Sequence, residues 1–138
     1  MNDVVREFLL ETDENLAQLD LDLVSLERNP REKETIARVF RTLHTVKGAA
    51  GFLGLVKLQA VSHAAESLLS KVRADEIPFG PPIATALLSV VDAIREILRA
   101  IETTASEGER DDAALIAQLE ALVRGETIGP PAPARAGA

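Results

Sequence analysis

The sequence predicts an all-α fold, an up-down-up-down four-helix bundle with an additional fifth helix at its C-terminal end. Apolar residues recur at three- and four-residue intervals, which is the spacing of one face of a helix. Short connections separate these segments, so consecutive helices are expected to run antiparallel. The composition agrees, because Leu, Ala, Ile and Val dominate while aromatic residues make up only 3%.

Five segments of the chain carry the helical pattern. Asn29 and Pro30 end the first segment, and because asparagine caps helices and proline suits a first turn, they are also expected to start the second. Glycines at 51 and 54 are expected to loosen the chain after the second segment. The fifth segment is shorter than the others and is expected to pack outside the bundle. The expected helices cover about residues 3–27, 30–50, 56–74, 82–106 and 111–124.

The chain divides into one domain and a tail. A length of 138 residues suits a single core, which we assign to residues 1–124. Residues 125–138 shift to Gly, Pro and Ala and end in GPPAPARAGA, a composition that cannot bury a core. We interpret this tail as a flexible linker and the chain as part of a larger protein.

Composition excludes several classes of function. A formal charge of −7 argues against binding a nucleic-acid backbone. The absence of cysteine excludes disulfides and thiolate chemistry. The acidic N-terminus is no signal peptide, and no apolar run approaches the ~20 residues of a membrane span. We therefore expect a soluble cytoplasmic protein that binds neither nucleic acid nor membrane.

His44 lies beside the apolar stripe of the second segment. At ~100° per residue from Ile36, it falls at about 80°, and Gly48 and Gly51 fall at about 120° and 60° on the same face. A glycine inside a helix costs about 1 kcal/mol relative to alanine. We interpret Gly48 and Gly51 as a bare docking surface that lets a partner protein reach His44; a close approach of two helices is the alternative. Gly54 is better interpreted as a helix end.

Three further side chains are placed near His44 by the same pattern. Lys47 follows it by three residues, within side-chain reach. Glu66 and His63 fall at the margin of the stripe of the third segment, and this margin can meet that of the second segment if the two helices are antiparallel neighbours. His63 is the nearer of the two to the solvent side.

These residue types suit a histidine nucleophile. A carboxylate that accepts the N–H of a neutral imidazole fixes the tautomer and leaves the other nitrogen with a lone pair. Glu66 is the candidate for this orienting role. The same carboxylate favours the imidazolium, which has no lone pair, whereas Lys47 opposes that charge and could help to neutralise an incoming phosphoryl group.

Two other kinds of site fit less well. A di-iron centre in a bundle needs two Glu-x-x-His motifs, but this chain has only the reversed order from His63 to Glu66. We therefore expect no metal. Ser62 and Ser67 flank His63 without the strained turn or oxyanion loop of a hydrolase.

Two stretches resemble the N-terminal histidine phosphotransfer (HPt) domain of CheA-type chemotaxis histidine kinases. They are LHTVKGAAGFLGL and LQAVSHAAESLLSKVRADEI. The H-x-x-K-G motif from His44 is shared by HPt domains generally, while H-x-x-E-x-L-L from His63 is more particular to CheA. The likeness spans about residues 1–124.

The resemblance implies a phosphoryl relay. In that family the histidine matching His44 is phosphorylated by the kinase's ATP-binding domain and passes the phosphoryl group to an aspartate of response regulators such as CheY and CheB. The glutamate matching Glu66 is the family's hydrogen-bond partner of the phosphorylated imidazole, and residues matching Lys47 and His63 assist. The resemblance implies no cofactor beyond ATP-derived phosphoryl, no kinase activity in this chain alone, and a monomeric fragment.

Two alternatives stay open. One is a free-standing HPt protein or the HPt domain of a hybrid kinase, which requires that the full gene end near Ala138. The other is a non-catalytic helical interaction domain, in which Leu10, Leu21 and Val24 bind a partner and His44 is incidental.

Overall fold

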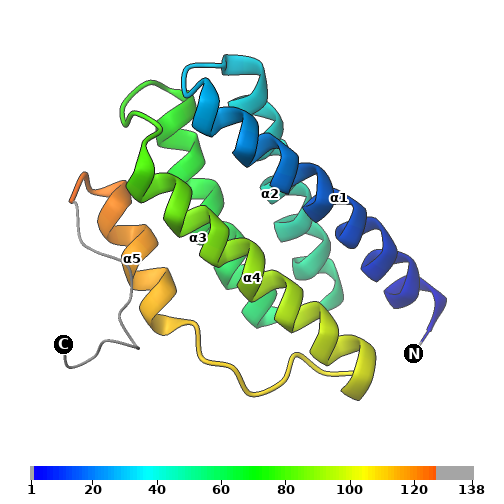
Figure 1. Cartoon of the computed structure of the whole chain (residues 1–138). Coiled ribbons are helices and arrows are strands. Elements are labelled where there is room, and N and C mark those ends of the chain that lie inside the picture. The colour runs from blue at the N-terminus through cyan, green and yellow to red at the C-terminus, as the bar shows by residue number, and fades with distance from the viewer. Residues whose placement is uncertain (1, 127–138) are drawn as a thin grey trace.

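The computed structural model describes residues 2–126, which form five α-helices (Figure 1). They are α1 (Asp3–Arg28), α2 (Lys33–Leu53), α3 (Val56–Arg73), α4 (Pro81–Thr104) and α5 (Ala113–Val123). The first four pack in a closed ring, each on its neighbours in the chain and α1 on α4. α5 lies against α3 and α4, outside this ring. The predicted fold class is confirmed, including the outer position of the fifth helix.

The core is almost entirely aliphatic. Burying a large aliphatic side chain stabilises the fold by about 1.5–3 kcal/mol, so these stripes determine how the helices pack. On α1 the pattern is shifted at the start, because Phe8 is buried while Val5 and Leu9 are half-buried. The apolar spacing predicts one stripe on α3 and one on α4, and both are buried throughout. Their residues are Leu58, Val61, Ala65, Leu68, Leu69 and Val72 on α3, and Ile83, Leu87, Val91, Ile94, Leu98 and Ile101 on α4.

The ends of α2 differ from the prediction. The Asn29 N–H donates to the Ser25 carbonyl at 2.9 Å, so Asn29 closes α1 and Pro30 lies in a turn. The expected start of the second helix at Pro30 is therefore wrong, and α2 begins at Lys33. The expected loosening at Gly51 is also wrong, because the helix continues to Leu53. Gly54 ends it with φ 75°, a left-handed conformation that favours glycine.

A buried carboxylate joins α1 to α2. Asp22 is almost fully buried and accepts hydrogen bonds from Arg38 Nη2 at 2.9 Å and Nε at 3.1 Å, and from Gln18 Nε2 at 3.1 Å. A buried charge is tolerated only with such partners. The pair therefore fixes the rotation of α2 about its axis, and with it the face that α2 turns to solvent.

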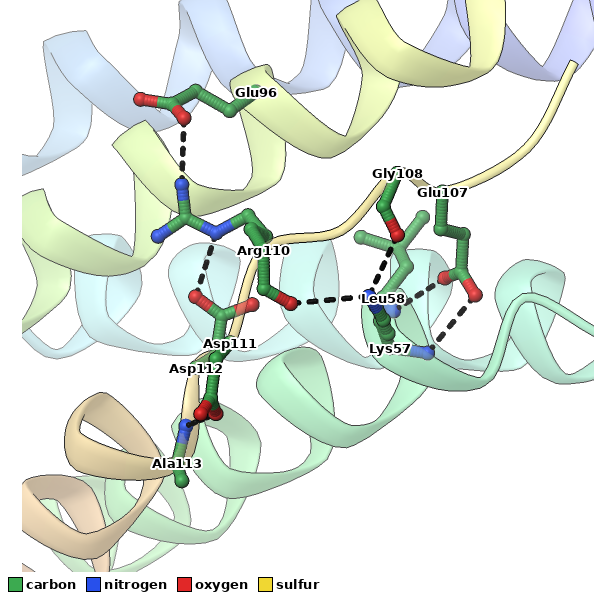
Figure 2. Close-up of polar contacts among 9 residues, drawn as sticks. All are labelled: Lys57, Leu58, Glu96, Glu107, Gly108, Arg110, Asp111, Asp112 and Ala113. Atoms are coloured by element: carbon green, nitrogen blue, oxygen red, sulfur yellow. Dashed lines mark hydrogen bonds and ion pairs between the residues drawn. The ribbon is translucent and has the colours of Figure 1, made fainter. Parts of the chain in front are cut away.

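The connection between α4 and α5 crosses the N-terminal end of α3 (Figure 2). The Glu107 carboxylate accepts hydrogen bonds from the backbone N–H groups of Lys57 at 3.2 Å and Leu58 at 2.8 Å. Lys57 Nζ in turn donates to the carbonyls of Gly108 and Arg110 at 2.7 and 3.1 Å. The N-cap residue of α3 makes no side-chain hydrogen bond, so a distant part of the chain supplies the cap.

No helix within residues 2–126 is long and apolar enough to cross a membrane. Most of the predicted linker, from residue 127 onward, lies outside the described residues. The boundary at residue 124 stays a prediction.

We predict that Glu107→Ala lowers the free energy of unfolding by about 1 kcal/mol, which is typical for loss of a helix cap. Glu109→Ala is the matched control, since Glu109 lies exposed in the same connection and should change stability by less than about 0.5 kcal/mol. Urea denaturation of both variants measures the difference. Equal effects would show that Glu107 does not act as a cap.

Candidate functional site

His44 stands on the outer face of α2, midway along the helix. Its side chain is 64% exposed. One turn further on, a Cβ built on Gly48 would meet no other atom within 4 Å. The helix surface beside the imidazole is therefore open to a partner, as the sequence pattern predicts for Gly48.

Gly51 is in a different environment from Gly48. A Cβ at Gly51 would lie 2.8 Å from the side-chain amide nitrogen of Gln59 on α3. The missing side chain thus leaves room for the end of the exposed Gln59 side chain, and no backbone atom of α3 lies as close. The close approach of two helices, which is the alternative that the sequence left open, stays a prediction. A docking role for either glycine stays a prediction.

Glu66 reaches His44 from α3. Its side chain is only 10% exposed, at the contact between α2 and α3. Oε2 is hydrogen-bonded to Nδ1 of His44, and Oε1 accepts a hydrogen bond from Lys47 Nζ at 2.6 Å. The structure therefore brings together three of the four side chains that the sequence singled out.

The charge state of Glu66 decides the tautomer of His44. Burial alone raises the pKa of the Glu66 carboxyl, but hydrogen bonds from Lys47 and His44 and the charge of Lys47 outweigh burial and hold the pKa below its ordinary value. An ionised carboxylate can only accept hydrogen bonds. Nδ1 of His44 must then carry the proton, which leaves the lone pair of a neutral ring on Nε2.

Lys47 is oriented toward Glu66 rather than toward open solvent. Its side chain is 26% exposed, and its ammonium lies on Oε1 of the same carboxylate that binds His44. The sequence placed Lys47 near His44 but did not predict this ion pair. Lys47 falls close to the apolar stripe of α2, which packs on α3, and Glu66 lies at the margin of the stripe of α3; this was the signal available in the sequence.

His63 lies beside this cluster without a hydrogen bond to it among the described residues. It is exposed on α3, as the pattern predicts, and lines a shallow hollow with Lys47, Val56 and Gln59. Within residues 2–126 it makes no hydrogen bond to His44 or Glu66. A role for His63 in assisting His44 stays a prediction.

Phe40 adjoins His44 and Arg73 adjoins Phe40, and sequence reasoning missed both contacts. The helical spacing from Ile36 predicts Phe40 in the apolar stripe of α2. In the structure Phe40 is half-buried, and its ring is nearly parallel to that of His44. The guanidinium of Arg73 covers the Phe40 ring. The spacing of four residues between Phe40 and His44 is the signal that could have indicated this contact.

The described part of the chain contains no group of three His, Asp or Glu side chains arranged to hold a metal ion. The arrangement offers a nucleophile: when the His44 ring is neutral, Nε2 carries a lone pair on an exposed side chain. The Glu66 carboxylate holds the ring at Nδ1.

We predict that the Glu66 carboxylate makes folding stability depend on pH at the acid end. Because its pKa is depressed in the folded state, its contribution is present above the unfolded pKa of about 4.3 and is lost as pH falls through the lower folded value. The free energy of unfolding should therefore fall less steeply below about pH 4.3 in Glu66→Gln than in the wild type. Urea titrations across pH 3–6 measure this, and parallel pH curves for the two proteins would contradict it.

The chain matches the Hpt domain family over residues 3–125. It is 35% identical over 128 residues to the sensor histidine kinase CheAY of Helicobacter pylori. That match covers 88% of this chain and 16% of the relative, so the chain spans a small part of the longer protein.

Solved structures agree with the family match. The CheA phosphotransferase domain from Thermotoga maritima is 32% identical with a TM-score of 0.71, over 75% of this chain and 100% of that one. The phosphorylated P1 domain of CheA3 from R. sphaeroides, in complex with CheY6, has a TM-score of 0.81 at 23% identity, over 91% of this chain and 98% of that one. At 23% identity, this second likeness shows a shared fold. The chain belongs to the Hpt domain family, which confirms the resemblance found in the sequence.

Proposed function

We propose that this domain is a phosphoryl relay in which His44 accepts a phosphoryl group on Nε2 and donates it to an aspartate of a response regulator. One observation carries the proposal: the Nδ1 contact with Glu66 orients a ring that is 64% exposed. A nucleophile that serves other proteins has to be oriented and reachable at once.

In the first step, the Nε2 lone pair of His44 attacks the γ-phosphorus of ATP held by a kinase ATP-binding domain of CheA type. A nitrogen–phosphorus bond forms, the bond from phosphorus to the β–γ bridging oxygen breaks, and its electron pair leaves with ADP. The ring becomes positively charged, and the Glu66 carboxylate stabilises that charge through Nδ1–H. ATP supplies the phosphoryl group, and this domain needs no cofactor of its own.

In the second step, a carboxylate oxygen of the regulator's aspartate attacks the phosphorus. The nitrogen–phosphorus bond breaks, its electrons return to Nε2, and His44 regains its starting form with the proton still on Nδ1. The site needs no group that moves far between the two steps, because Glu66 holds the same nitrogen throughout.

The partners follow from the relatives. The Helicobacter pylori relative is a sensor histidine kinase, and the P1 domain of CheA3 was solved with CheY6. We infer a kinase domain of CheA type as donor and regulators of CheY or CheB type as acceptors. The domain acts as a monomer in the cytoplasm, where ATP and response regulators are found.

A second candidate function, a non-catalytic interaction domain, is favoured by the exposed apolar side chains of Leu10, Leu21 and Val24 on α1. These residues lie on a different helix from His44. Substitution of His44 should therefore abolish the relay and leave an interaction through α1 intact.

We predict that His44→Gln abolishes phosphorylation and leaves the fold intact, because an exposed ring contributes little to the core. The measurement is incubation with the cognate CheA-type kinase domain and labelled ATP, followed by a test for acid-labile, base-stable label. His63→Gln is the control that keeps the label, and circular dichroism checks helicity. Label at the wild-type level in His44→Gln would end the relay proposal.

We predict that Glu66→Ala slows phosphorylation of His44 more than His63→Ala does. Without the carboxylate, the His44 ring can rotate and either nitrogen can carry the proton. An orienting or acid–base group commonly raises a reaction rate 10²- to 10⁴-fold, so we expect Glu66→Ala to lower the phosphorylation rate about 10²-fold. His63 makes no hydrogen bond to the cluster among the described residues, so its removal should have the smaller effect. Rates are measured at saturating kinase and ATP. If His63→Ala were phosphorylated more slowly than Glu66→Ala, His63 would be the orienting residue and Glu66 the assisting one.

A further inference from the structure

Three side chains form a stack that ends at His44. The Phe40 ring, one turn earlier on α2, lies with its centroid 6.2 Å from that of His44 and its plane tilted by only 13°. Cζ of Arg73, from the last residue of α3, lies 4.0 Å from the Phe40 centroid. The stack therefore links the end of α3 to the imidazole on α2.

His44 needs a second constraint besides Glu66. One hydrogen bond to Nδ1 fixes a single point of the ring, and the ring can still swing about that point because its side chain is 64% exposed. The torsion that turns an imidazole is broad rather than confined to narrow wells. A flat neighbour packed along the ring restricts this torsion, and Phe40 is so placed.

Arg73 in turn holds Phe40. The Phe40 ring is only half-buried, so part of it would face water without a cover. The Arg73 guanidinium makes neither a hydrogen bond nor an ion pair within residues 2–126, which leaves the aromatic ring as its contact there. Its place at the C-terminal end of α3 suits the helix dipole, but the dipole does not explain why the group lies over Phe40.

We propose that Phe40 and Arg73 are positioning residues for phosphoryl transfer at His44. Phe40 restricts rotation of the imidazole so that Nδ1 stays on Glu66 and Nε2 points outward, and Arg73 fixes Phe40. This proposal rests on the proposed relay function, and one of its two tests is independent of that function.

The independent test is nitrogen NMR of the His44 ring in the isolated domain, without kinase. In the wild type the proton should lie mainly on Nδ1. Phe40→Leu should let the ring leave Glu66 and raise the share of the Nε2–H tautomer, while Phe40→Tyr, which keeps the ring, should restore the wild-type spectrum. An unchanged tautomer ratio in Phe40→Leu would overturn the role of Phe40 whether or not the domain is phosphorylated.

The second test is the rate of phosphorylation by a CheA-type kinase domain, separated into kcat and KM. We expect Phe40→Leu to lower kcat about tenfold with KM unchanged, less than the 10²-fold that misplacement of a reacting group can cause. A change in KM alone would overturn the proposal and assign Phe40 to docking. Phe8→Leu on α1 controls for lost packing, and circular dichroism confirms folding.

Arg73 has a matched control in Arg28, which is also exposed and also the last residue of its helix. Arg73→Gln should lower kcat two- to fivefold, about the worth of an exposed cation–π contact, whereas Arg28→Gln should not change it. In the Phe40→Leu background, Arg73→Gln should have no further effect, because both act through one stack. Equal effects of the two arginine variants, or additive effects in the double variant, would overturn the role of Arg73. Absence of label on the wild-type protein would instead count against the relay function.

Discussion

The arrangement around His44 depends on one buried carboxylate. Glu66 lies at the contact of α2 and α3, where an unpartnered charge would be strongly unfavourable. Lys47 and His44, both on α2, supply its hydrogen bonds, one to each oxygen. The same contacts that make the buried charge tolerable therefore fix the register of α3 against α2 and the tautomer of a neutral imidazole.

The sequence predicted the helices well because burial of aliphatic stripes dominates their packing, and a stripe is visible in the spacing of residues. It also indicated the meeting of His44 with Glu66, since both residues lie at stripe margins, and such margins can meet on antiparallel neighbours. It could not predict where Lys47 points, because a helical wheel gives the direction of a Cβ and not the end of a long side chain. For the same reason the spacing, which puts Phe40 in the apolar stripe, does not reveal that its ring lies against His44.

The errors at helix ends have another cause. Asn29 and Pro30 suit a helix start as well as a helix end. In the structure the Asn29 N–H donates to the Ser25 carbonyl, so these residues end α1 and do not start α2. The cap of α3 was invisible because Glu107 comes from some fifty residues further along the chain. Such contacts exist only once the tertiary fold has formed, so a local pattern does not reveal them.

In the proposed relay the exposure of His44 explains why the residues that orient its ring come from within the domain. Two partners have to reach Nε2, so nothing can cover it from outside, and the ring must be held at Nδ1 and by the stacked ring of Phe40. Glu66 stabilises the positive ring that phosphorylation creates, but too firm a hold would oppose release to the regulator. Lys47 shares the same carboxylate and so draws away part of its charge. The pair thus balances acceptance of the phosphoryl group against its donation, as a carrier with two partners requires.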